Sequence, residues 1–340
     1  MQPMPHVVII GAGVAGASAA ATLADAGWRV TLVDKAARPG GRCATRRLAA
    51  DTASPWFDYG AQYFTARDPA FRQAIASDLD AGALCHWRPM LHVAEHGDAG
   101  WRRTPSPDER ERLISPRGLN DWIRYRLDQT TADIECRRRV SAVARTTQGW
   151  QLQFADDAAS QNADALIVTL PAVQAAGLLG ELADDMPELA AADSALSPCH
   201  SLVVAAPALA DCHGIFVKGG HLAWCADNTH KAGHGEAATH LWTLHAGPAF
   251  STDHLEDDPQ TIATMLIEEF AALGGLATAR IKPVHQHRWR YARPGAKPPP
   301  ADTRCLARPE LRLALAGDWL AGGRIEGAWL SGRAAADALR

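Results

Sequence analysis

Apolar and polar positions divide the start of the chain into a strand, a turn, a helix and a second strand. His6 to Ile10 is a short apolar stretch rich in β-branched residues, which is typical of a buried strand. A glycine-rich turn from Gly11 to Gly16 follows, and the alanine-rich segment Ala17 to Ala26, closed by Gly27, predicts a helix. Trp28 to Val33 is apolar again and predicts a second strand. The chain therefore opens with a βαβ unit.

Similar buried strands are predicted in the middle and near the end of the chain. "ADALIVTLPAVQAAGLL" reads as a strand ended by Pro171 and followed by a helix, and "LRLALAGDWL" reads as another buried strand. The stretches between them predict a hairpin around Thr147 to Gly149, short strands from Ala192 to His245, a helix from Asp258 to Ala272 and a proline-rich loop from Arg293 to Cys305. The buried strands are thus separated by mixed structure.

This order predicts an α/β protein with two domains. A chain of 340 residues exceeds the length that one hydrophobic core usually serves. We expect a Rossmann-type nucleotide-binding domain, assembled from separated segments, with a mixed-sheet substrate domain inserted. The predicted nucleotide-binding segments are residues 1–75, 107–175 and 300–340, and the predicted substrate-domain segments are residues 76–106 and 176–299.

Composition narrows the classes of partner. The net charge of −4 gives no general case for nucleic acid or an anionic membrane surface, and the first apolar run is too short to span a bilayer and leads into a glycine turn, so no signal peptide is expected. The 7 cysteines are scattered, with no C-x-x-C pair, which argues against a disulfide framework or a zinc site and favours a reducing cytoplasm. The histidines between His213 and His245 match no ligand spacing, so we expect no metal.

The first glycine-rich turn predicts a dinucleotide site. Gly11 permits the tight turn, Gly13 lets a pyrophosphate approach the backbone, and Gly16 lets helix and strand pack closely. The helix start offers free N–H groups to phosphates, and Asp34 at the end of the second strand can accept hydrogen bonds from ribose hydroxyls. Ala15 and Lys35 belong to the same predicted site. These residues leave NAD and FAD open.

The loop that follows and the C-terminal end favour FAD. "RPGGRCATR" resembles the extension of amine-oxidase-like flavoproteins, in which Gly41 allows close approach and Arg42 offers a planar fork to phosphate or flavin oxygens. Near the C-terminus, Gly317 and Asp318 end a strand, and Asp318 can hold the ribityl chain. A helix start at Glu326, Gly327 and Ala328 can direct N–H groups at the flavin edge that becomes negative on reduction. Two helix starts would then hold the two ends of one FAD.

Three stretches together carry a family resemblance over nearly the whole chain. "GGRCATRR…FDYGAQYFTARD", "HRWRYARP" and "GDWLAGGRIEGAWLSG" resemble the renalases, within the amine-oxidase superfamily. The resemblance implies a fold like that of p-hydroxybenzoate hydroxylase. It also implies that Gly60, Ala61, Gln62, Tyr63 and Phe64 lie beside the flavin and that Val140 meets the adenine.

The same resemblance implies an activity. Such enzymes oxidise dihydro-NAD(P) isomers, reduced at the 2 or 6 position, by hydride transfer to flavin N5, which gives NAD(P)+; O2 then reoxidises the flavin and yields hydrogen peroxide. The candidate pocket residues are His245, Trp242, Tyr63, Gln62, Trp289 and Arg288. No cysteine follows Cys305, so we expect non-covalent FAD.

Two other classes remain open. A flavin amine oxidase or desaturase would use the same scaffold, often with a lysine bridged by water to the flavin, but no sequence motif singles out Lys218, Lys231, Lys282 or Lys297. A flavin-bearing protein without catalysis would keep the cofactor residues and lose the pocket residues. The preferred isomer, the choice between NADH-type and NADPH-type substrates, and the oligomeric state are left open.

Overall fold

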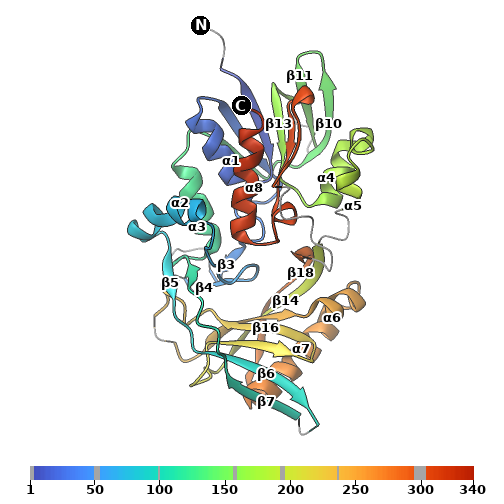
Figure 1. Ribbon diagram of the computed structural model, residues 1–340. Coiled ribbons are helices and arrows are strands. Elements are labelled where there is room, and N and C mark those ends of the chain that lie inside the picture. Colours follow the sequence, from blue (N-terminus) through green and yellow to red (C-terminus); the bar gives the residue numbers. More distant parts are fainter. Residues whose placement is uncertain are drawn as a thin grey trace.

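A computed structural model describes residues 4–49, 54–98, 100–155, 159–191, 196–235, 237–294 and 304–340. Two large sheets organise these residues, one in each half of the molecule (Figure 1). The upper half in this view holds the first and last helices, and the lower half holds the sheet formed mainly by the middle of the chain.

A six-stranded sheet forms the centre of the upper half. Its order is β19 (Leu306–Arg308), β20 (Leu313–Leu315), β13 (Ala165–Val168), β1 (His6–Ile10), β2 (Arg29–Asp34) and β9 (Asp133–Cys136). Neighbours from β20 to β9 run parallel, and only β19 is antiparallel to its neighbour. β1 and β13 are buried along their whole length, as expected for parallel strands that are covered on both faces. The carboxyl ends of β1, β2, β13 and β20 therefore share one edge.

Both faces of this sheet are covered. One face shares a core with α1 (Val14–Asp25), α2 (Pro69–Asp80), α3 (Leu119–Asp128) and α8 (Ile325–Asp337). The other face packs against β10 (Val140–Thr146), β11 (Gly149–Phe154), β12 (Gln161–Ala163), α4 (Ala172–Leu179) and α5 (Pro187–Ala191). α8 lies along α1 so closely that a Cβ at Gly332 would come within 2.0 Å of the Ala15 carbonyl oxygen. Helices from the two ends of the chain are thus packed together.

A seven-stranded mixed sheet forms the lower half. Its order is β18 (Lys282–Pro294), β14 (Leu196–Ala206), β17 (His240–Ala246), β16 (Leu222–Asp227), β15 (Gly214–Lys218), β6 (Leu91–Gly97) and β7 (Gly100–Pro105). Helices α6 (Pro248–Asp253) and α7 (Pro259–Gly274) share a core with one face. The other face meets β4 (Trp56–Asp58), which pairs with β3 (Thr45–Arg47), through contacts of Phe57 and Tyr59. A small pair of strands, β5 (Cys85–Trp87) and β8 (Arg112–Ile114), completes the junction.

The predicted fold class is confirmed, with shifts at the borders of elements and domains. The first helix begins at Val14, before the predicted Ala17, because Gly13 already stands at its N-cap. Several segments that were predicted in part for the substrate domain share a core with the nucleotide-binding sheet: α2, Leu84, α4 and α5. From this packing we propose that the inserted domain comprises about residues 85–105 and 196–294. Of the predicted loop from Arg293 to Cys305, residues 295–303, with Lys297, lie outside the described residues.

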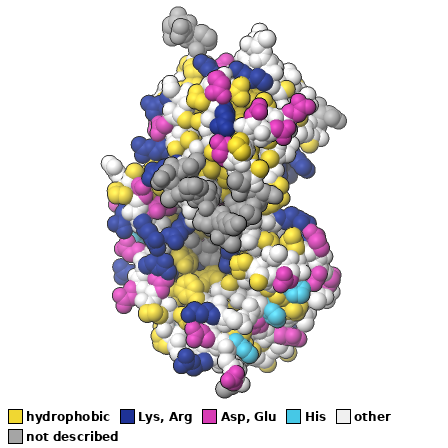
Figure 2. Space-filling model, turned by 45° about the vertical axis from the view of Figure 1, so that its right-hand side comes forward, with side chains coloured by type: hydrophobic (Ala, Val, Ile, Leu, Met, Phe, Trp, Pro, Cys, Tyr) yellow, Lys and Arg dark blue, Asp and Glu magenta, His cyan; other side chains and the backbone are white. Residues whose placement is uncertain are grey.

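The surface carries charges of both signs. Figure 2 shows Lys and Arg side chains gathered along one flank, near the level at which the two halves meet, with Asp and Glu interspersed elsewhere on the same face. Across the described part of the chain, no helix is both long enough and apolar enough to cross a membrane.

Candidate active site

The Gly11 turn lies at the carboxyl edge of the six-stranded sheet. Gly11 has φ +109°, a conformation that favours glycine, and the Thr169 hydroxyl donates to its carbonyl oxygen over 2.9 Å. A Cβ at Gly16 would come within 1.9 Å of that same carbonyl oxygen. At Gly13 an added Cβ would meet nothing within 4 Å, and no side chain of the described residues caps α1. The helix start therefore faces open space with its N–H groups free, as phosphate binding requires.

Asp34 is held in place beside this turn. Its carboxylate accepts hydrogen bonds from the backbone N–H groups of Ala12 and Ala36, each over 2.7 Å. The N–H of Arg138 donates to the carbonyl oxygen of Asp34 over 2.9 Å, so the chain leading to Val140 passes this strand end. The residues predicted for the ribose and adenine, Asp34 and Val140, thus belong to neighbouring segments, and Lys35 is exposed next to them.

Arg42 joins the two glycine-rich ends of the chain. The Gly40 N–H donates to the Ala12 carbonyl oxygen over 2.8 Å, and an added Cβ at Gly41 would lie 3.3 Å from the Cα of Gly13. The guanidinium of Arg42 forms a two-point ion pair with Asp318, which includes an Nη1–Oδ2 distance of 3.0 Å. Residues predicted separately to bind one cofactor therefore lie together.

At the start of α8, near this edge, none of the described side chains caps the helix N-terminus either. A Cβ at Gly327 would come within 1.9 Å of the Ala321 carbonyl oxygen, so glycine lets the preceding loop pack beneath the helix. The Glu326 side chain points to another element: its carboxylate accepts hydrogen bonds from the backbone N–H groups of Arg67 and Asp68 at the start of α2. The backbone of the predicted Glu326–Ala328 segment fits the flavin role, whereas the Glu326 side chain braces α2.

These observations fit the expected FAD. Two uncapped helix starts stand near the carboxyl edge of one sheet, Gly13 leaves space, and Arg42 with Asp318 connects the two regions. When bound, FAD supplies the acceptor for two electrons. Ligands of open doubly wound sheets bind at this kind of edge.

The segment from Asp58 to Gln62 runs between the two halves of the molecule. The carbonyl oxygen of Tyr59 accepts from the Ser201 hydroxyl over 2.7 Å and from the Trp289 indole N–H over 3.1 Å. The Nε2 atom of His245 lies 3.4 Å from the same oxygen. The three partners come from β14, β18 and β17, which are neighbours in the lower sheet. This sheet therefore holds Tyr59 from one side.

A platform of rings surrounds Tyr59; the term denotes Tyr59, His285, His287 and Trp289. The Tyr59 and Trp289 rings are stacked, with centroids 5.6 Å apart and an interplanar angle of 19°, and His285 and His287 meet the Tyr59 ring edge-on. Arg46 lies beside the platform, with Nη1 3.2 Å from Nδ1 of His285. The platform offers flat, partly exposed surfaces to a planar ligand.

Burial sets the protonation of the neighbouring histidine. Desolvation, with a smaller effect of the Arg293 charge, lowers the pKa of His245 to about 3. His285 has its pKa lowered to about 4 by burial and by Arg46. Both imidazoles are therefore neutral near pH 7 and available as hydrogen-bonding groups only.

Not all predicted pocket residues share this face. Trp242 lies on the opposite face of the sheet from His245, packed against Phe270 under α7. Arg288 turns away from the platform and pairs with Glu256 over 2.9 Å. Side chains alternate between the two faces of a strand. Trp242 is three positions from His245, and Arg288 is next to Trp289, so neither lies on the face of the platform. Trp242 and Arg288 are therefore not candidate pocket residues.

Three further side chains that were expected beside the flavin contact protein groups instead: those of Gln62, Tyr63 and Phe64. Phe64 stacks on Trp122 inside the nucleotide-domain core. Tyr63 packs against Trp87 and Trp224. The Gln62 amide is buried and donates to the carbonyl oxygens of Asp58 and Gly60 over 2.5 and 3.1 Å. These three side chains are therefore engaged with other protein groups, and the backbone of Gly60 and Ala61 remains the candidate contact with the cofactor.

Comparison with known proteins decides the family. The model of the family described as flavin containing amine oxidoreductase matches residues 95–340, and that of an NAD(P)-binding Rossmann-like domain matches residues 9–77. This chain belongs to the flavin containing amine oxidoreductases. The predicted cofactor, FAD, and the predicted class, an FAD-dependent oxidoreductase, are confirmed by this membership.

Two individual relatives match over short stretches. An L-amino-acid oxidase of Siganus canaliculatus is 47% identical over 68 residues, which are 20% of this chain and 12% of the relative. A hydroxyneurosporene desaturase of Rubrivivax gelatinosus is 49% identical over 100 residues, 28% of this chain and 17% of the relative. The chain thus spans a small part of the length of these relatives.

Two solved structures have a similar fold over nearly the whole chain. A putative protoporphyrinogen oxidase from an Exiguobacterium species has a TM-score of 0.74 at 13% identity and covers 99% of both chains. A putrescine oxidase has a TM-score of 0.71 at 14% identity and covers 98% of both chains. At these identities the likeness shows the fold.

Cys43, the residue after Arg42, is an unsuitable nucleophile. Burial raises the pKa of Cys43 to about 12, with a further contribution from the Asp58 charge. A thiol held in its protonated form reacts slowly. Non-covalent attachment of FAD therefore stays our prediction.

Asp34→Ala is expected to weaken FAD binding by at least about tenfold, since it removes hydrogen bonds to a charged group worth about 1.5–3 kcal/mol each. It also leaves the N–H groups of Ala12 and Ala36 without their acceptor. Titration of the apoprotein with FAD, followed by quenching of flavin fluorescence, measures this affinity. Unchanged affinity would contradict the assignment of Asp34 to the ribose, and Asp25→Ala on the same domain provides the control.

Proposed function

We propose that this flavin containing amine oxidoreductase is an oxidase of dihydro-NAD(P) isomers, the 2- or 6-dihydro forms, and returns NAD(P)+ and hydrogen peroxide. The observation that supports it best is the charge beside the ring platform. Arg46 lies at His285, and the Arg293 charge acts on His245. Within the described part of the chain, neither arginine forms an ion pair with an acid. A cationic surround favours a substrate with phosphates and disfavours a protonated amine.

The residues of the platform suit a nicotinamide ring. Tyr59 and Trp289 offer stacked faces to a planar ring, and His245 is a neutral hydrogen-bonding group next to them. A dihydronicotinamide becomes aromatic as its hydride leaves, so no general base is needed. The protein then has to orient the donor carbon, and the hydrogen bond from the buried Ser201 hydroxyl to the Tyr59 carbonyl oxygen supports that role by holding one ring of the platform in place.

A flavin amine oxidase is the second candidate. Its support comes from relatives that carry this chemistry, the L-amino-acid oxidases and, by fold, a putrescine oxidase. Many such enzymes use a lysine bridged by water to the flavin. Lys231, which is buried, already directs its ammonium to the side chains of Asp58, Gln62 and Asn228. Because these three acceptors already occupy the ammonium group, Lys231 is a poor candidate for a lysine that holds a water at the flavin.

One anaerobic experiment separates the two candidates. The oxidised enzyme is mixed in a stopped-flow instrument with 2- and 6-dihydro-NAD(P), with putrescine or with L-amino acids, and the bleaching of the flavin is followed. We expect bleaching within seconds by a dihydro-NAD(P) isomer only. Bleaching by an amine or amino acid, with dihydro-NAD(P) inert, would overturn the proposal. Ordinary 4-dihydro-NADH provides the control for unspecific reduction.

The rate of flavin reduction by the true substrate is expected to be nearly flat from about pH 6 to 9, because no group of the platform has to lose a proton. His245, with a pKa of about 3, stays neutral through this range. His245→Asn is therefore expected to weaken substrate binding or alignment without abolishing reduction. Rapid-reaction measurements across pH test both points. A steep rise with a single ionisation, lost in His245→Asn, would assign His245 as a base and favour amine oxidation.

A further inference from the structure

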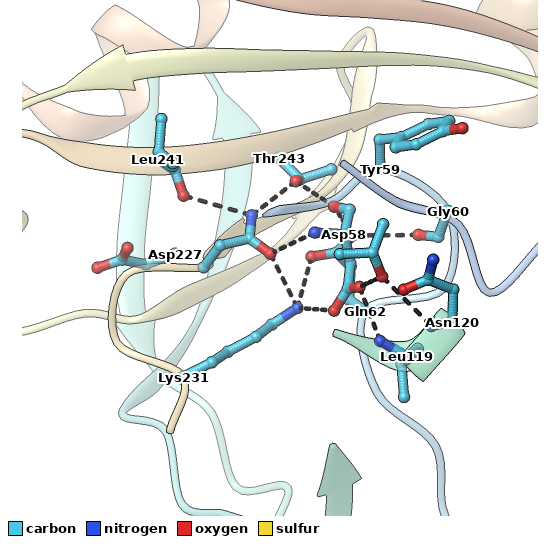
Figure 3. Close-up of polar contacts among 12 residues, drawn as sticks. Asp58, Tyr59, Gly60, Gln62, Leu119, Asn120, Asp227, Lys231, Leu241 and Thr243 are labelled. Carbon is cyan, nitrogen blue, oxygen red and sulfur yellow. Dashed lines mark hydrogen bonds and ion pairs between the residues drawn. The ribbon is translucent and has the colours of Figure 1, made fainter. Parts of the chain in front are cut away.

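Lys231 is the centre of a buried polar cluster at the junction of the two halves (Figure 3). Its side chain and that of Asp58 are both 0% exposed, and their Nζ and Oδ2 atoms lie 3.0 Å apart. The other two contacts of Nζ are Oε1 of Gln62 at 3.1 Å and Oδ1 of Asn228 at 2.9 Å. An ammonium group has three donors, so these three acceptors satisfy Lys231 completely.

Asp58 receives bonds from both domains. On the nucleotide side, its carboxylate accepts from the hydroxyl of Thr45 over 2.5 Å and from the N–H of Leu119 over 3.0 Å. On the substrate side, its N–H donates to Asn228 over 3.1 Å, and its carbonyl oxygen accepts from the Thr243 hydroxyl over 2.7 Å. Asp58 therefore ties the two domains to one short segment.

The segment continues to the cofactor residues. The Gln62 amide, whose oxygen is held by Lys231, donates to the Gly60 carbonyl oxygen over 3.1 Å. The Ala61 N–H donates to the Arg42 carbonyl oxygen over 2.9 Å, and a Cβ at Gly60 would come within 2.0 Å of that oxygen. Arg42 in turn pairs with Asp318. A continuous set of contacts thus leads from Lys231 to the predicted flavin-binding residues.

We propose that Lys231 and Asp58 are positioning residues: their buried ion pair fixes the segment 58–62 and with it the position of the substrate sheet relative to bound FAD. This proposal rests on the FAD site and is independent of the substrate class. Ion pairs as deeply buried as this one can often be replaced by apolar residues without loss of stability. Its value here is alignment, because hydride transfer depends steeply on the distance and angle between donor and acceptor.

The test uses the double variant Asp58→Asn/Lys231→Met, which removes both charges together and avoids an unpaired buried ion. We expect it to bind FAD stoichiometrically. Its limiting rate of anaerobic flavin reduction is expected to fall at least about tenfold, while substrate affinity stays within about threefold, since a misplaced donor affects reaction more than binding. The reductant is whichever compound bleaches the wild-type enzyme, so failure of the dihydro-NAD(P) assignment does not affect the comparison.

A readout without turnover accompanies the kinetics. Hydrogen exchange of the peptide covering residues 56–64 is expected to accelerate at least about tenfold in the FAD-loaded double variant, because local opening no longer breaks the bonds of Lys231. If the double variant fails to fold, Gln62→Met, which removes only the amide that Lys231 holds, is expected to show the same direction of change in both measurements.

A matched pair inside one domain provides the control. Arg126 and Asp78 form a largely buried ion pair between α3 and α2, and among the described residues the other hydrogen bonds of these two side chains go to Ala74 and Trp122, not to the segment 58–62. Asp78→Asn/Arg126→Met is expected to change stability but to keep the wild-type reduction rate per bound FAD. Wild-type exchange and a wild-type rate in Asp58→Asn/Lys231→Met, or in Gln62→Met where that variant has to be used, would overturn the proposal.

Discussion

Replacing Lys231 alone by methionine is expected to lower the free energy of unfolding at neutral pH by about 3–5 kcal/mol, because it leaves a buried carboxylate without its counter-ion. Methionine has a similar length and fills the same space, so the loss reports the charge rather than a cavity. Among the described residues, the Asp58 carboxylate would keep the Thr45 hydroxyl and the Leu119 N–H as its hydrogen-bond donors. Denaturation by urea, followed by tryptophan fluorescence, measures the change.

Lys218 offers the matched control. It pairs with Glu95 over 2.9 Å, but their side chains are 66% and 48% exposed. An exposed pair contributes about 0–1 kcal/mol, so Lys218→Met is expected to change stability little. The double variant Asp58→Asn/Lys231→Met is expected to recover most of the loss of Lys231→Met. Equal small losses for Lys231→Met and Lys218→Met would mean that water reaches Asp58 and stabilises its charge.

The nucleotide-binding part could be predicted from sequence because each of its elements is a local pattern. The runs "HVVII" and "ALIV" are buried from end to end, and such continuous runs are typical of central parallel strands. Gly16 is required by a close contact with the Gly11 carbonyl oxygen five positions earlier, and Gly11 by its own backbone conformation, with φ +109°. Asp34 follows at the end of the adjacent strand. The spacing of residues within a short stretch was therefore sufficient to predict the nucleotide-binding part.

Part of the pocket was predicted wrongly although the sequence held the necessary information. Trp242 and His245 are three residues apart on one strand, and Arg288 and Trp289 are adjacent. Side chains alternate between the faces of a strand, so neither pair can share a face. Grouping these residues by their motif, and not by the parity of their positions, led to the two errors.

The Lys231 cluster could not be predicted by such rules. Its partner Asp58 is 173 positions away in the sequence, and Gln62 is 169 positions away. The lysine lies in a loop between β16 and β17, where no periodicity indicates burial, and lysine is rarely buried in general. The sequence gives one indirect sign that Lys231 has a special role: most of the basic residues of this chain are arginines, so a lysine stands out.

Acidification from pH 7 to about pH 4 is expected to destabilise the fold through histidines that burial keeps neutral. The pKa of His245 is lowered to about 3, and those of His213, His234 and His285 are lowered to about 4, with desolvation as the largest cause in each. The unfolded chain binds protons at these positions near pH 6.5, while the folded chain does not. Their contribution to stability is therefore complete above about pH 6.5 and declines as the pH falls towards the folded-state values.

His245 allows the sign and size of this effect to be tested. As a residue only 8% exposed, it is expected to contribute up to about 1.4 kcal/mol per pH unit between pH 6.5 and 4, whereas the three partly exposed histidines contribute less. Urea denaturation at several pH values gives the slope of stability against pH. His245→Asn is expected to reduce that slope, because the unfolded variant lacks this proton-binding site, and replacement of the exposed His86 by asparagine is expected to leave it unchanged. A slope that is the same in wild type and His245→Asn would show that His245 is protonated in the folded protein too. It would then carry a positive charge beside Tyr59 at mildly acidic pH, and the flat pH dependence expected for flavin reduction would have to be given up with it.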